Sequence, residues 1–212
     1  EGRLDGAVIA ELRRRGKAAM PKLKNAVQAM IRSLESDGSA SDVSEDTTAT
    51  IMFTDIVGHT TTMQRLGDRA GRQVFARHDE IILRLTGEFS GKIIKSMGDG
   101  FMITFRSATR GVACAIAIQR ELESYNRQRG ENSIQVRMGI SVGEPVNEND
   151  DLFGLSVIQA ARISAKAGSR QIYVSQIVHI LTANTGDFVY ETVGEMELKG
   201  LDGKQMVYEV RW

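Results

Sequence analysis

The order of apolar segments from residue 49 onward is the feature that most restricts how this chain can fold. Some segments are rich in β-branched and aromatic residues, which is typical of strands, and others repeat apolar residues at helical spacing. The predicted elements are a strand at Ala49–Ile56, a helix at Met63–Leu85, strands at Lys92–Ser96 and Phe101–Phe105, a helix around Ala108–Gln128 and a strand at Ile134–Val142. The order β-α-β-β-α-β is that of the ferredoxin-like arrangement.

More elements follow this core. They are a helix from about Gly154 to Ala167, a strand at Gln171–Val174, and two or three strands near Phe188, Met196 and Val207. The sequence therefore predicts an α+β fold, with a ferredoxin-like βαββαβ core and an α/β extension.

The first 46 residues differ in composition from the rest. Residues 1–34 carry eight Lys or Arg against three Asp or Glu, and apolar residues within 23–34 recur at i, i+3, i+4 and i+7, which predicts a basic amphipathic helix. Residues 35–46 hold five acids and no base, a composition typical of a flexible linker. We therefore divide the chain into an N-terminal helical segment (1–34), an acidic linker (35–46) and a domain at 47–212.

Charge and cysteine content narrow the class of protein. The 27 Lys and Arg balance the 27 Asp and Glu, so the chain lacks the basic excess of general nucleic-acid binders. Cys114 is the single cysteine, which excludes an internal disulfide, and its apolar neighbours predict burial. No apolar stretch is long enough to span a bilayer and no signal peptide is visible, which favours a cytoplasmic setting.

The chain begins at Glu1 rather than at a methionine. We therefore expect a piece of a longer protein, in which the missing N-terminal region carries an upstream sensor domain or a membrane attachment.

Two aspartates have neighbours that suggest metal binding. Asp55 ends the first strand, and Asp99 lies in Met97-Gly98-Asp99-Gly100, a connection typical of a tight hairpin. Strand ends and hairpin tips of one sheet can bring two carboxylates together, where they repel unless a cation lies between them. Magnesium suits such a pair, because it keeps waters and takes other oxygens from phosphate. The competing interpretation is that Asp99 only serves the turn.

Six short motifs occur in a fixed order from about residue 49 to the C-terminus. Their order and spacing resemble those of the class III adenylyl and guanylyl cyclases. The motifs are Phe53-Thr54-Asp55-Ile56-Val57-Gly58-His59-Thr60, Lys95-Ser96-Met97-Gly98-Asp99-Gly100, Val136-Arg137-Met138-Gly139-Ile140, Asp151-Leu152-Phe153-Gly154, Ala160-Ala161-Arg162 and Leu198-Lys199-Gly200-Leu201. The resemblance implies a signalling enzyme that closes a nucleoside triphosphate into a cyclic monophosphate and releases pyrophosphate.

The resemblance also implies roles for individual residues. Asp55 and Asp99 match the metal-binding aspartates, the carbonyl of Ile56 is a further ligand, and the cofactors are two divalent ions, Mg²⁺ or Mn²⁺. The other matched positions are Lys95 and Asp151 for the adenine edge, Arg162 for the charge that develops on the transferred phosphorus, and Arg137 and Lys199 for the phosphates. A ribose 3′-oxygen then attacks the α-phosphorus in line, while metals and cations position and neutralise the phosphates.

The base-reading pair favours ATP as the substrate. A lysine donates to ring N1 of adenine and an aspartate accepts from its exocyclic amino group, whereas guanine presents the opposite pattern. Guanylyl cyclases carry a Glu and a Cys-type residue at these positions. The resemblance therefore implies an adenylyl cyclase that forms 3′,5′-cyclic AMP.

The family's arrangement divides the site between two protomers. One protomer supplies Asp55, Asp99 and Arg137, and the other supplies Lys95, Asp151, Arg162 and Lys199. Because this chain carries both sets, the resemblance implies a homodimer with two equivalent sites and an inactive monomer.

The match fails at a catalytic position. Four residues before Arg162, where the family has an asparagine, the chain has Ile158, which cannot donate a hydrogen bond. Losing one preorganised donor costs about 10²–10³ in rate, and Gln159 is the candidate substitute. Ser141 and Val142 also replace the family's His-Thr pair. These departures predict a slow cyclase or one that needs upstream activation.

Two other functions stay open. One is a catalytically silent nucleotide-binding domain for dimerisation or regulation, although such a domain would not need the retained metal ligands. The other is a cyclase for another nucleotide, such as GTP. A diguanylate-type cyclase is disfavoured, because Phe101 follows Gly100 and the second acid of its hairpin motif is absent. The three histidines, His59, His78 and His179, lack matching partners and are expected on helix or loop surfaces.

Overall fold

The computed structural model describes residues 48–127, 129–130 and 133–212, so the predicted N-terminal helix and acidic linker lie outside the described residues. The core elements are β1 (Ala49–Ile56), α3 (His59–Glu88), β2 (Lys92–Ser96), β3 (Phe101–Phe105), α4 (Ala108–Asn126) and β4 (Val136–Gly143). They are followed by β5 (Val146–Glu148), β6 (Asp151–Phe153), α5 (Leu155–Lys166), β7 (Ile172–Ser175), α6 (Gln176–Thr182), a 3₁₀ turn (Ala183–Thr185), β8 (Val189–Glu197) and β9 (Lys204–Arg211).

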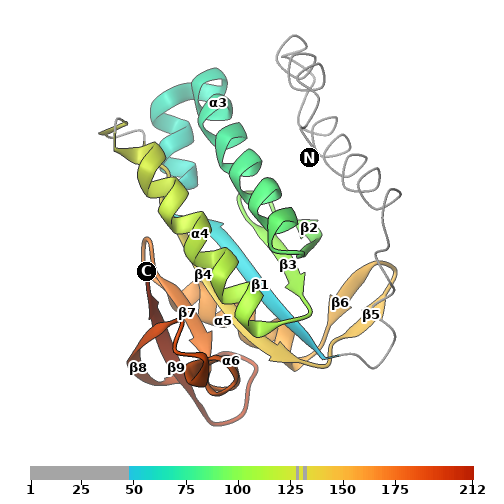
Figure 1. Ribbon diagram of the computed structural model, residues 1–212. Coiled ribbons are helices and arrows are strands. Elements are labelled where there is room, and N and C mark those ends of the chain that lie inside the picture. The colour runs from blue at the N-terminus through green and yellow to red at the C-terminus, as the bar shows by residue number, and fades with distance from the viewer. Residues whose placement is uncertain (1–47, 128, 131–132) are drawn as a thin grey trace. The chain divides into compact units, whose positions relative to one another are not determined.

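The strands of the described region form a seven-stranded sheet in the order β2-β3-β1-β4-β7-β9-β8, beside a separate β5–β6 hairpin (Figure 1). β1 pairs antiparallel with β3 and β4, and β3 pairs antiparallel with β2. This is the ferredoxin-like core. β7 joins β4 in parallel, and β9 and β8 extend the sheet in antiparallel fashion. The predicted α+β fold class is confirmed.

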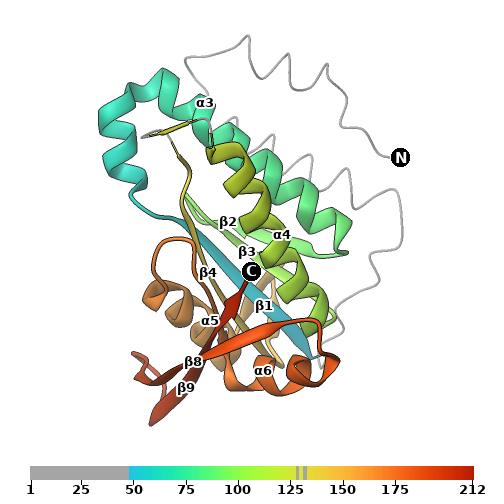
Figure 2. The ribbon, with the colours of Figure 1, turned by 60° about the vertical axis from the view of Figure 1, so that its left-hand side comes forward.

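The side chains of β1 alternate between two covered faces of the sheet. Thr50 approaches Gly111 of α4, whereas Ile51 and Phe53 pack in a cluster with residues of α5 and β6. Helices α3 and α4 lie side by side over the first face (Figures 1 and 2), and α5 covers the second. Because successive strand residues point to opposite faces, Asp55 lies on the face that α5 covers.

Helix α5 approaches β4 at a glycine. A Cβ atom at Gly139 would lie 2.2 Å from the backbone nitrogen of Ser164 and 2.5 Å from the carbonyl oxygen of Ala160. Backbone atoms cannot move aside as a flexible side chain can, so the absence of a side chain at Gly139 sets how closely α5 lies over the sheet. That spacing positions Gln159 and Arg162 of α5 relative to the sheet.

The sequence pattern misses the shorter elements. β5 and β6 have three residues each, too few for alternation to be recognised, and α6 with its 3₁₀ turn is also unpredicted. Near the C-terminus the structure has two strands, β8 and β9. None of the described helices is both long and apolar enough to cross a membrane.

Two buried side chains test the expectations for single residues. The expected surface position of His78 is wrong: its side chain is fully buried, because it shares one face of α3 with the buried Ile81, Ile82 and Leu85. Cys114 is buried as predicted, and desolvation raises the pKa of its thiol to about 12.

Candidate active site

The first candidate metal ligand lies at the end of β1, opposite an arginine of β4. Asp55 and Arg137 are partners in the β1–β4 register. Arg137 donates from Nε to Oδ2 of Asp55 over 2.7 Å, and its Nη2 lies 2.5 Å from the same oxygen. Both contacts use Oδ2, and neither involves Oδ1 of Asp55. Arg137, the predicted phosphate ligand, is thus directly bonded to a predicted metal ligand.

The second aspartate lies on the hairpin between β2 and β3. The hairpin is closed by a bond from the backbone nitrogen of Met97 to the carbonyl of Gly100 (2.8 Å), as the sequence predicts. A Cβ atom at Gly100 would lie 1.9 Å from the carbonyl oxygen of Thr54. The hairpin therefore lies directly against the backbone that precedes Asp55, which brings the segments of Asp55 and Asp99 together.

A lysine and an aspartate distant in sequence meet on the same face of the sheet. Lys95 of β2 donates from Nζ to Oδ2 of Asp151 of β6 over 2.5 Å, and both side chains are about one-third exposed (37% and 29%). Oδ1 of Asp151 accepts from the backbone nitrogen of Leu152 (2.8 Å), which fixes the carboxylate plane. The structure thus brings together the two predicted base-reading residues, although the β5–β6 hairpin that carries Asp151 was not predicted from the sequence.

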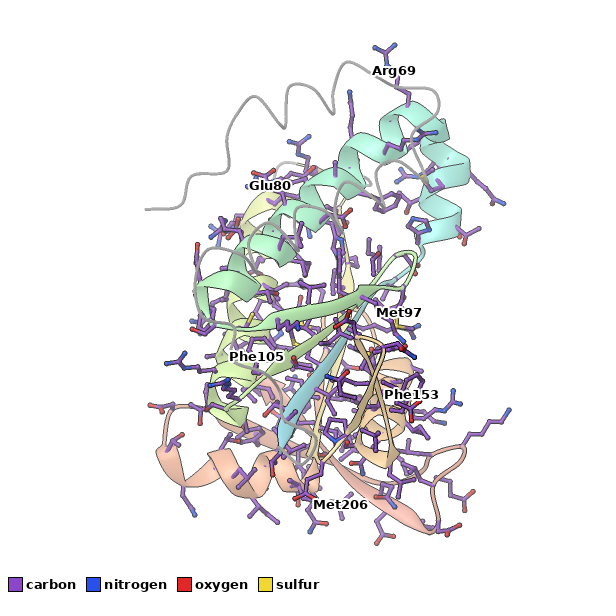
Figure 3. The ribbon with its side chains drawn as sticks, turned by 90° about the vertical axis from the view of Figure 1, so that its right-hand side faces the viewer. Arg69, Glu80, Met97, Phe105, Phe153 and Met206 are labelled. Carbon is purple, nitrogen blue, oxygen red and sulfur yellow. The ribbon has the colours of Figure 1, made fainter. Side chains whose placement is uncertain are left out.

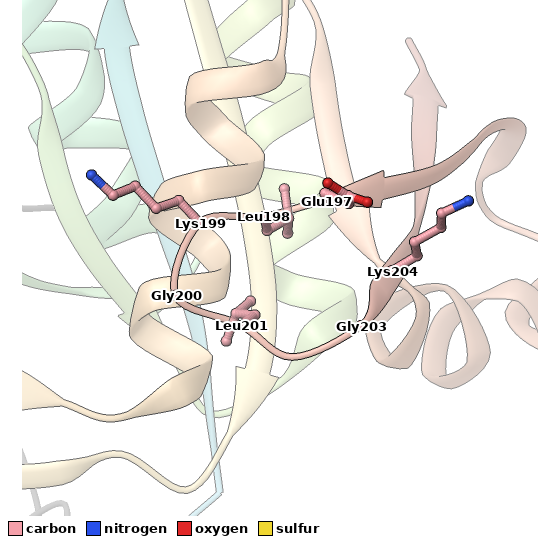
Figure 4. A pocket seen from close by; sticks show the side chains of 7 residues that line it. All are labelled: Glu197, Leu198, Lys199, Gly200, Leu201, Gly203 and Lys204. Atoms are coloured by element: carbon pink, nitrogen blue, oxygen red, sulfur yellow. The ribbon is translucent and has the colours of Figure 1, made fainter.

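The predicted transition-state arginine lies on the exposed side of α5. Arg162 donates from Nε to the carbonyl oxygen of Lys199 over 3.2 Å. Lys199 lies in the loop 198–203 between β8 and β9, which borders a cavity of about 460 Å³ (Figure 4). In Figure 4 the side chains of Lys199 and Lys204 extend in opposite directions from this loop. Arg162 and Lys199 are therefore joined through the backbone of the loop, and both side chains are exposed.

The two α5 residues before Arg162 have different surroundings. Ile158, which replaces the family's asparagine, is 38% exposed. The carboxamide of Gln159 is bonded at both ends: Oε1 accepts from Oγ of Ser141 (2.6 Å), and Nε2 donates to Oε1 of Gln205 (2.9 Å). Gln159 is thus engaged with β4 and β9, and these partners are not apparent from the sequence motifs.

The donor set fits a magnesium-type ion better than zinc. The described residues contain no group of three or more His, Cys, Asp or Glu side chains able to hold a metal. Zinc normally takes three or four such ligands, whereas magnesium is satisfied by one or two carboxylates, waters and phosphate oxygens. The carboxylates of Asp55 and Asp99, on two segments that lie against each other at Gly100, and the carbonyl of Ile56 are oxygen donors of the kind that magnesium prefers.

A histidine near this donor set belongs to the first motif, but no role was predicted for it from the sequence. Nδ1 of His59, in the first turn of α3, lies 3.9 Å from Oδ2 of Asp99, and its ring lies 4.3 Å from that of Phe75. Gly58 has a left-handed backbone (φ 73°), which turns the chain from β1 into α3. The available signal was the short Asp55–His59 spacing at this predicted strand end.

Several exposed apolar side chains lie close in sequence to these polar groups. They are Val57, Met97, Phe153, Leu155 and Ile158. Met97 and Phe153 lie on one face of the domain (Figure 3). Lys95 also extends over the ring of Phe153, with Nζ 6.0 Å from its centroid. At least one of these apolar side chains, Phe153, thus contacts the predicted base-reading pair.

Comparisons with known proteins agree with this geometry. The family model for the adenylate and guanylate cyclase catalytic domain matches residues 42–211. The chain is 32% identical over 155 residues to a Rhizobium meliloti (strain 1021) protein assigned as adenylate cyclase 3, an alignment that covers 73% of this chain and 26% of that protein. The chain thus spans about a quarter of that relative's length.

Solved structures show the same fold. An adenylate/guanylate cyclase/hydrolase from Silicibacter pomeroyi is 28% identical with a TM-score of 0.70, covering 78% of this chain and 97% of its own. The adenylyl cyclase CyaB from P. aeruginosa is 20% identical with a TM-score of 0.70, covering 78% and 94%. Since the family match extends over most of the sequence, this chain belongs to the adenylate and guanylate cyclase catalytic domain family.

Proposed function

We propose that this domain is an adenylyl cyclase, which converts ATP into 3′,5′-cyclic AMP and pyrophosphate at the interface of a homodimer. The observation that carries the proposal is the Lys95–Asp151 pair, whose Nζ and Oδ2 are 2.5 Å apart. An ammonium donor beside a carboxylate acceptor complements ring N1 and the exocyclic amino group of adenine. The Watson–Crick edge of guanine has a donor at N1 and an acceptor at O6, so the same pair opposes it.

The reaction requires two divalent ions, Mg²⁺ or Mn²⁺, held by Asp55, Asp99 and the carbonyl of Ile56. When bound, these ions lower the pKa of the ribose 3′-hydroxyl and neutralise charge on the phosphates. Asp55 offers Oδ1 to such an ion while Arg137 remains on Oδ2. Arg137 thereby orients the carboxylate and keeps a positive charge beside the phosphates.

The remaining cations act on the triphosphate. Nε of Arg162 is bonded to the carbonyl of Lys199, which leaves the two Nη groups of the guanidinium to face the nucleotide. A guanidinium there stabilises the charge that develops on the α-phosphorus, and the ammonium of Lys199 holds the β- and γ-phosphates.

A second copy of the chain completes the site. In the proposed dimer, Asp55, Asp99 and Arg137 of one protomer face Lys95, Asp151, Arg162 and Lys199 of its partner. Exposed apolar side chains close in sequence to the site residues support this, since exposed apolar surface favours protein contacts; they are Val57, Met97, Phe153, Leu155 and Ile158. An isologous dimer then holds two equivalent sites. In the full-length protein we infer a cytoplasmic domain that an upstream sensor controls.

Ile158 favours a second candidate, a slow or silent nucleotide-binding domain that serves dimerisation or regulation. Its exposed side chain (38%) offers no donor at the family's asparagine position. A GTP cyclase remains the third possibility, which the Lys95–Asp151 pair disfavours.

The proposal is tested with the purified domain, ATP and Mn²⁺ or Mg²⁺. We expect metal-dependent formation of cyclic AMP and pyrophosphate in equal amounts, and loss of activity in Asp55→Asn and Asp99→Asn. ATP binding without cyclic AMP, even in the full-length dimer, would select the silent domain instead. Faster conversion of GTP than of ATP would select the third candidate.

A further inference from the structure

The loop that carries Lys199 is fastened to α5 at two points. Arg162 donates from Nε to the carbonyl of Lys199 (3.2 Å). One turn earlier on the helix, Nε2 of Gln159 donates to Oε1 of Gln205 (2.9 Å), at the start of β9. Residues 159 and 162 are three apart and share one face of the helix. Both ends of the loop 198–203 are therefore bonded to the same face of α5.

The hydrogen bonds form a continuous chain in which each amide has a defined orientation. Ser141 donates to Gln159, Gln159 donates to Gln205, and Nε2 of Gln205 donates to the carbonyl of Asp202 in the loop (3.0 Å). Ser141 is fully buried, so the chain starts at a fixed point in the sheet. An amide with its oxygen and nitrogen both bonded is rigidly held, which suits it to positioning.

Packing and backbone turns support the same connection. Leu198 is buried in a cluster with Ile163 of α5, and Leu201 packs against that cluster. Gly200 and Gly203 have positive φ (89° and 69°), which lets the loop reverse between these contacts. Apolar packing thus holds the middle of the loop, while the hydrogen bonds define its ends.

We propose that Gln159 and Gln205 are positioning residues, which hold the loop 198–203 on α5 and so set the distance between Lys199 and Arg162. This inference rests on the proposed function, in which both cations contact one triphosphate. It gives Gln159 a role through the loop, in place of the direct contact with the nucleotide that the missing asparagine suggests.

The test uses Gln205→Ala, Gln159→Ala and a matched control, Gln171→Ala. Gln171 also bonds through its amide to β9, at Glu209 (3.0 Å), but far along the strand from the loop. Hydrogen exchange of the backbone amides of 198–203 is measured first, without nucleotide. We expect faster exchange in the first two variants and no change in the control.

Steady-state kinetics of cyclic AMP formation then distinguish a positioning role of Gln205 from a general loss of structure. Gln205→Ala should raise the KM for ATP about 3–10-fold, the equivalent of about one net hydrogen bond, with little change in kcat. In a Lys199→Ala background, Gln205→Ala should have no further effect, because its action passes through Lys199. Gln205→Glu keeps an acceptor for Nε2 of Gln159 but loses the donor to the carbonyl of Asp202, so it should restore only part of the affinity.

Unchanged exchange in both variants, or effects of Gln205→Ala and Lys199→Ala that add fully, would overturn the inference. A fall in kcat confined to Gln159→Ala would also overturn it and indicate direct contact with the nucleotide. Failure of the proposed function has a different signature: the wild type would form no cyclic AMP, while the exchange of 198–203 would still respond to the variants.

Discussion

At the scale of single residues, the candidate site consists of charged pairs that the nucleotide and its metals would join. Arg137 bonds to one oxygen of Asp55, and Lys95 bonds to one oxygen of Asp151. Within each pair, the positive and the negative charge compensate each other while the substrate is absent. A carboxylate whose position is fixed by such a pair needs little reorganisation when the ligand arrives.

The proposed base-reading pair, Lys95 and Asp151, is tested by exchanging it for the Glu and Cys-type pair of guanylyl cyclases. Replacing Lys95 by Glu and Asp151 by Cys should lower the ratio of ATP to GTP in kcat/KM by about 10–100-fold, because a buried donor or acceptor without its partner costs about 1–3 kcal/mol. Initial rates with both nucleotides measure this ratio. Arg106→Ala, in the loop after β3, serves as the control. An unchanged ATP-to-GTP ratio in the double variant would contradict the role proposed for Lys95 and Asp151.

Ile158→Asn should increase activity. An asparagine there restores a donor one helical turn from Arg162, and one preorganised donor is worth about 10²–10³ in kcat in comparable sites, so a gain of at least about tenfold is expected. Ile158→Val, which keeps the position apolar, should leave kcat unchanged. A similar kcat in all three proteins would show that this helix position does not face the reacting groups.

The residue-level contacts were predictable from the sequence to different degrees. Lys95 and Asp151 were predicted as a pair from their motifs, and the structure brings them together. For Gln159, helical spacing indicates only that it lies near Arg162. Its actual partners, Ser141 and Gln205, come from two strands, and such long-range hydrogen bonds depend on sheet order and register, which local patterns do not encode.

At the scale of elements, whether a helix or strand could be predicted from the sequence depended on its length and on the periodicity of its apolar residues. β1, β2 and β3 have the predicted bounds, since five to eight residues of strand-type composition between clear turns are recognisable. The segment of α6 reads Gln-Ile-Val-His-Ile-Leu-Thr, a short apolar run that fits a helix or a strand equally. The position of β6 mattered most, because this three-residue strand carries Asp151.

The contact between β4 and α5 should not tolerate a side chain at position 139. Gly139→Ala places a Cβ atom 2.2 Å from a backbone nitrogen of α5, and overpacking of this kind costs about 1–3 kcal/mol. Urea unfolding should show this loss. Gly87→Ala, in α3 with no atom within 4 Å of the added Cβ, should cost nothing. Equal stability of the two variants would contradict the described packing.

Cys114 in α4 should make stability depend on alkaline pH. Burial raises the pKa of its thiol from its usual 9.0 to about 12, so above pH 9 the unfolded chain binds fewer protons than the folded chain. The free energy of unfolding therefore falls as pH rises, by about 1 kcal/mol between about pH 8 and 10 from this group. Urea titrations at both pH values measure the fall, and Cys114→Ala should remove this part of it. An identical pH slope in Cys114→Ala would show that the thiol is solvated.

At the scale of the whole domain, one sheet face gathers the candidate site. Asp55, Arg137 and Lys95 come from three strands, and parity places their side chains on the face that α5 and the β5–β6 hairpin cover. The fold class was predictable because the order of strands and helices restricts the topology strongly. How the two halves of the site combine would be a property of the proposed homodimer, which local patterns in a single chain do not describe.

Complementation between two inactive variants tests the shared site most directly. Asp99→Asn removes a proposed metal ligand from one half-site, and Arg162→Ala removes the proposed transition-state cation from the other. We expect each variant alone to be inactive. Co-expressed in equal amounts, they should recover about a quarter of wild-type cyclic AMP formation, because about half of randomly formed dimers are mixed and each mixed dimer has one intact site of two. Activity of the mixture no higher than that of either variant alone would contradict the account.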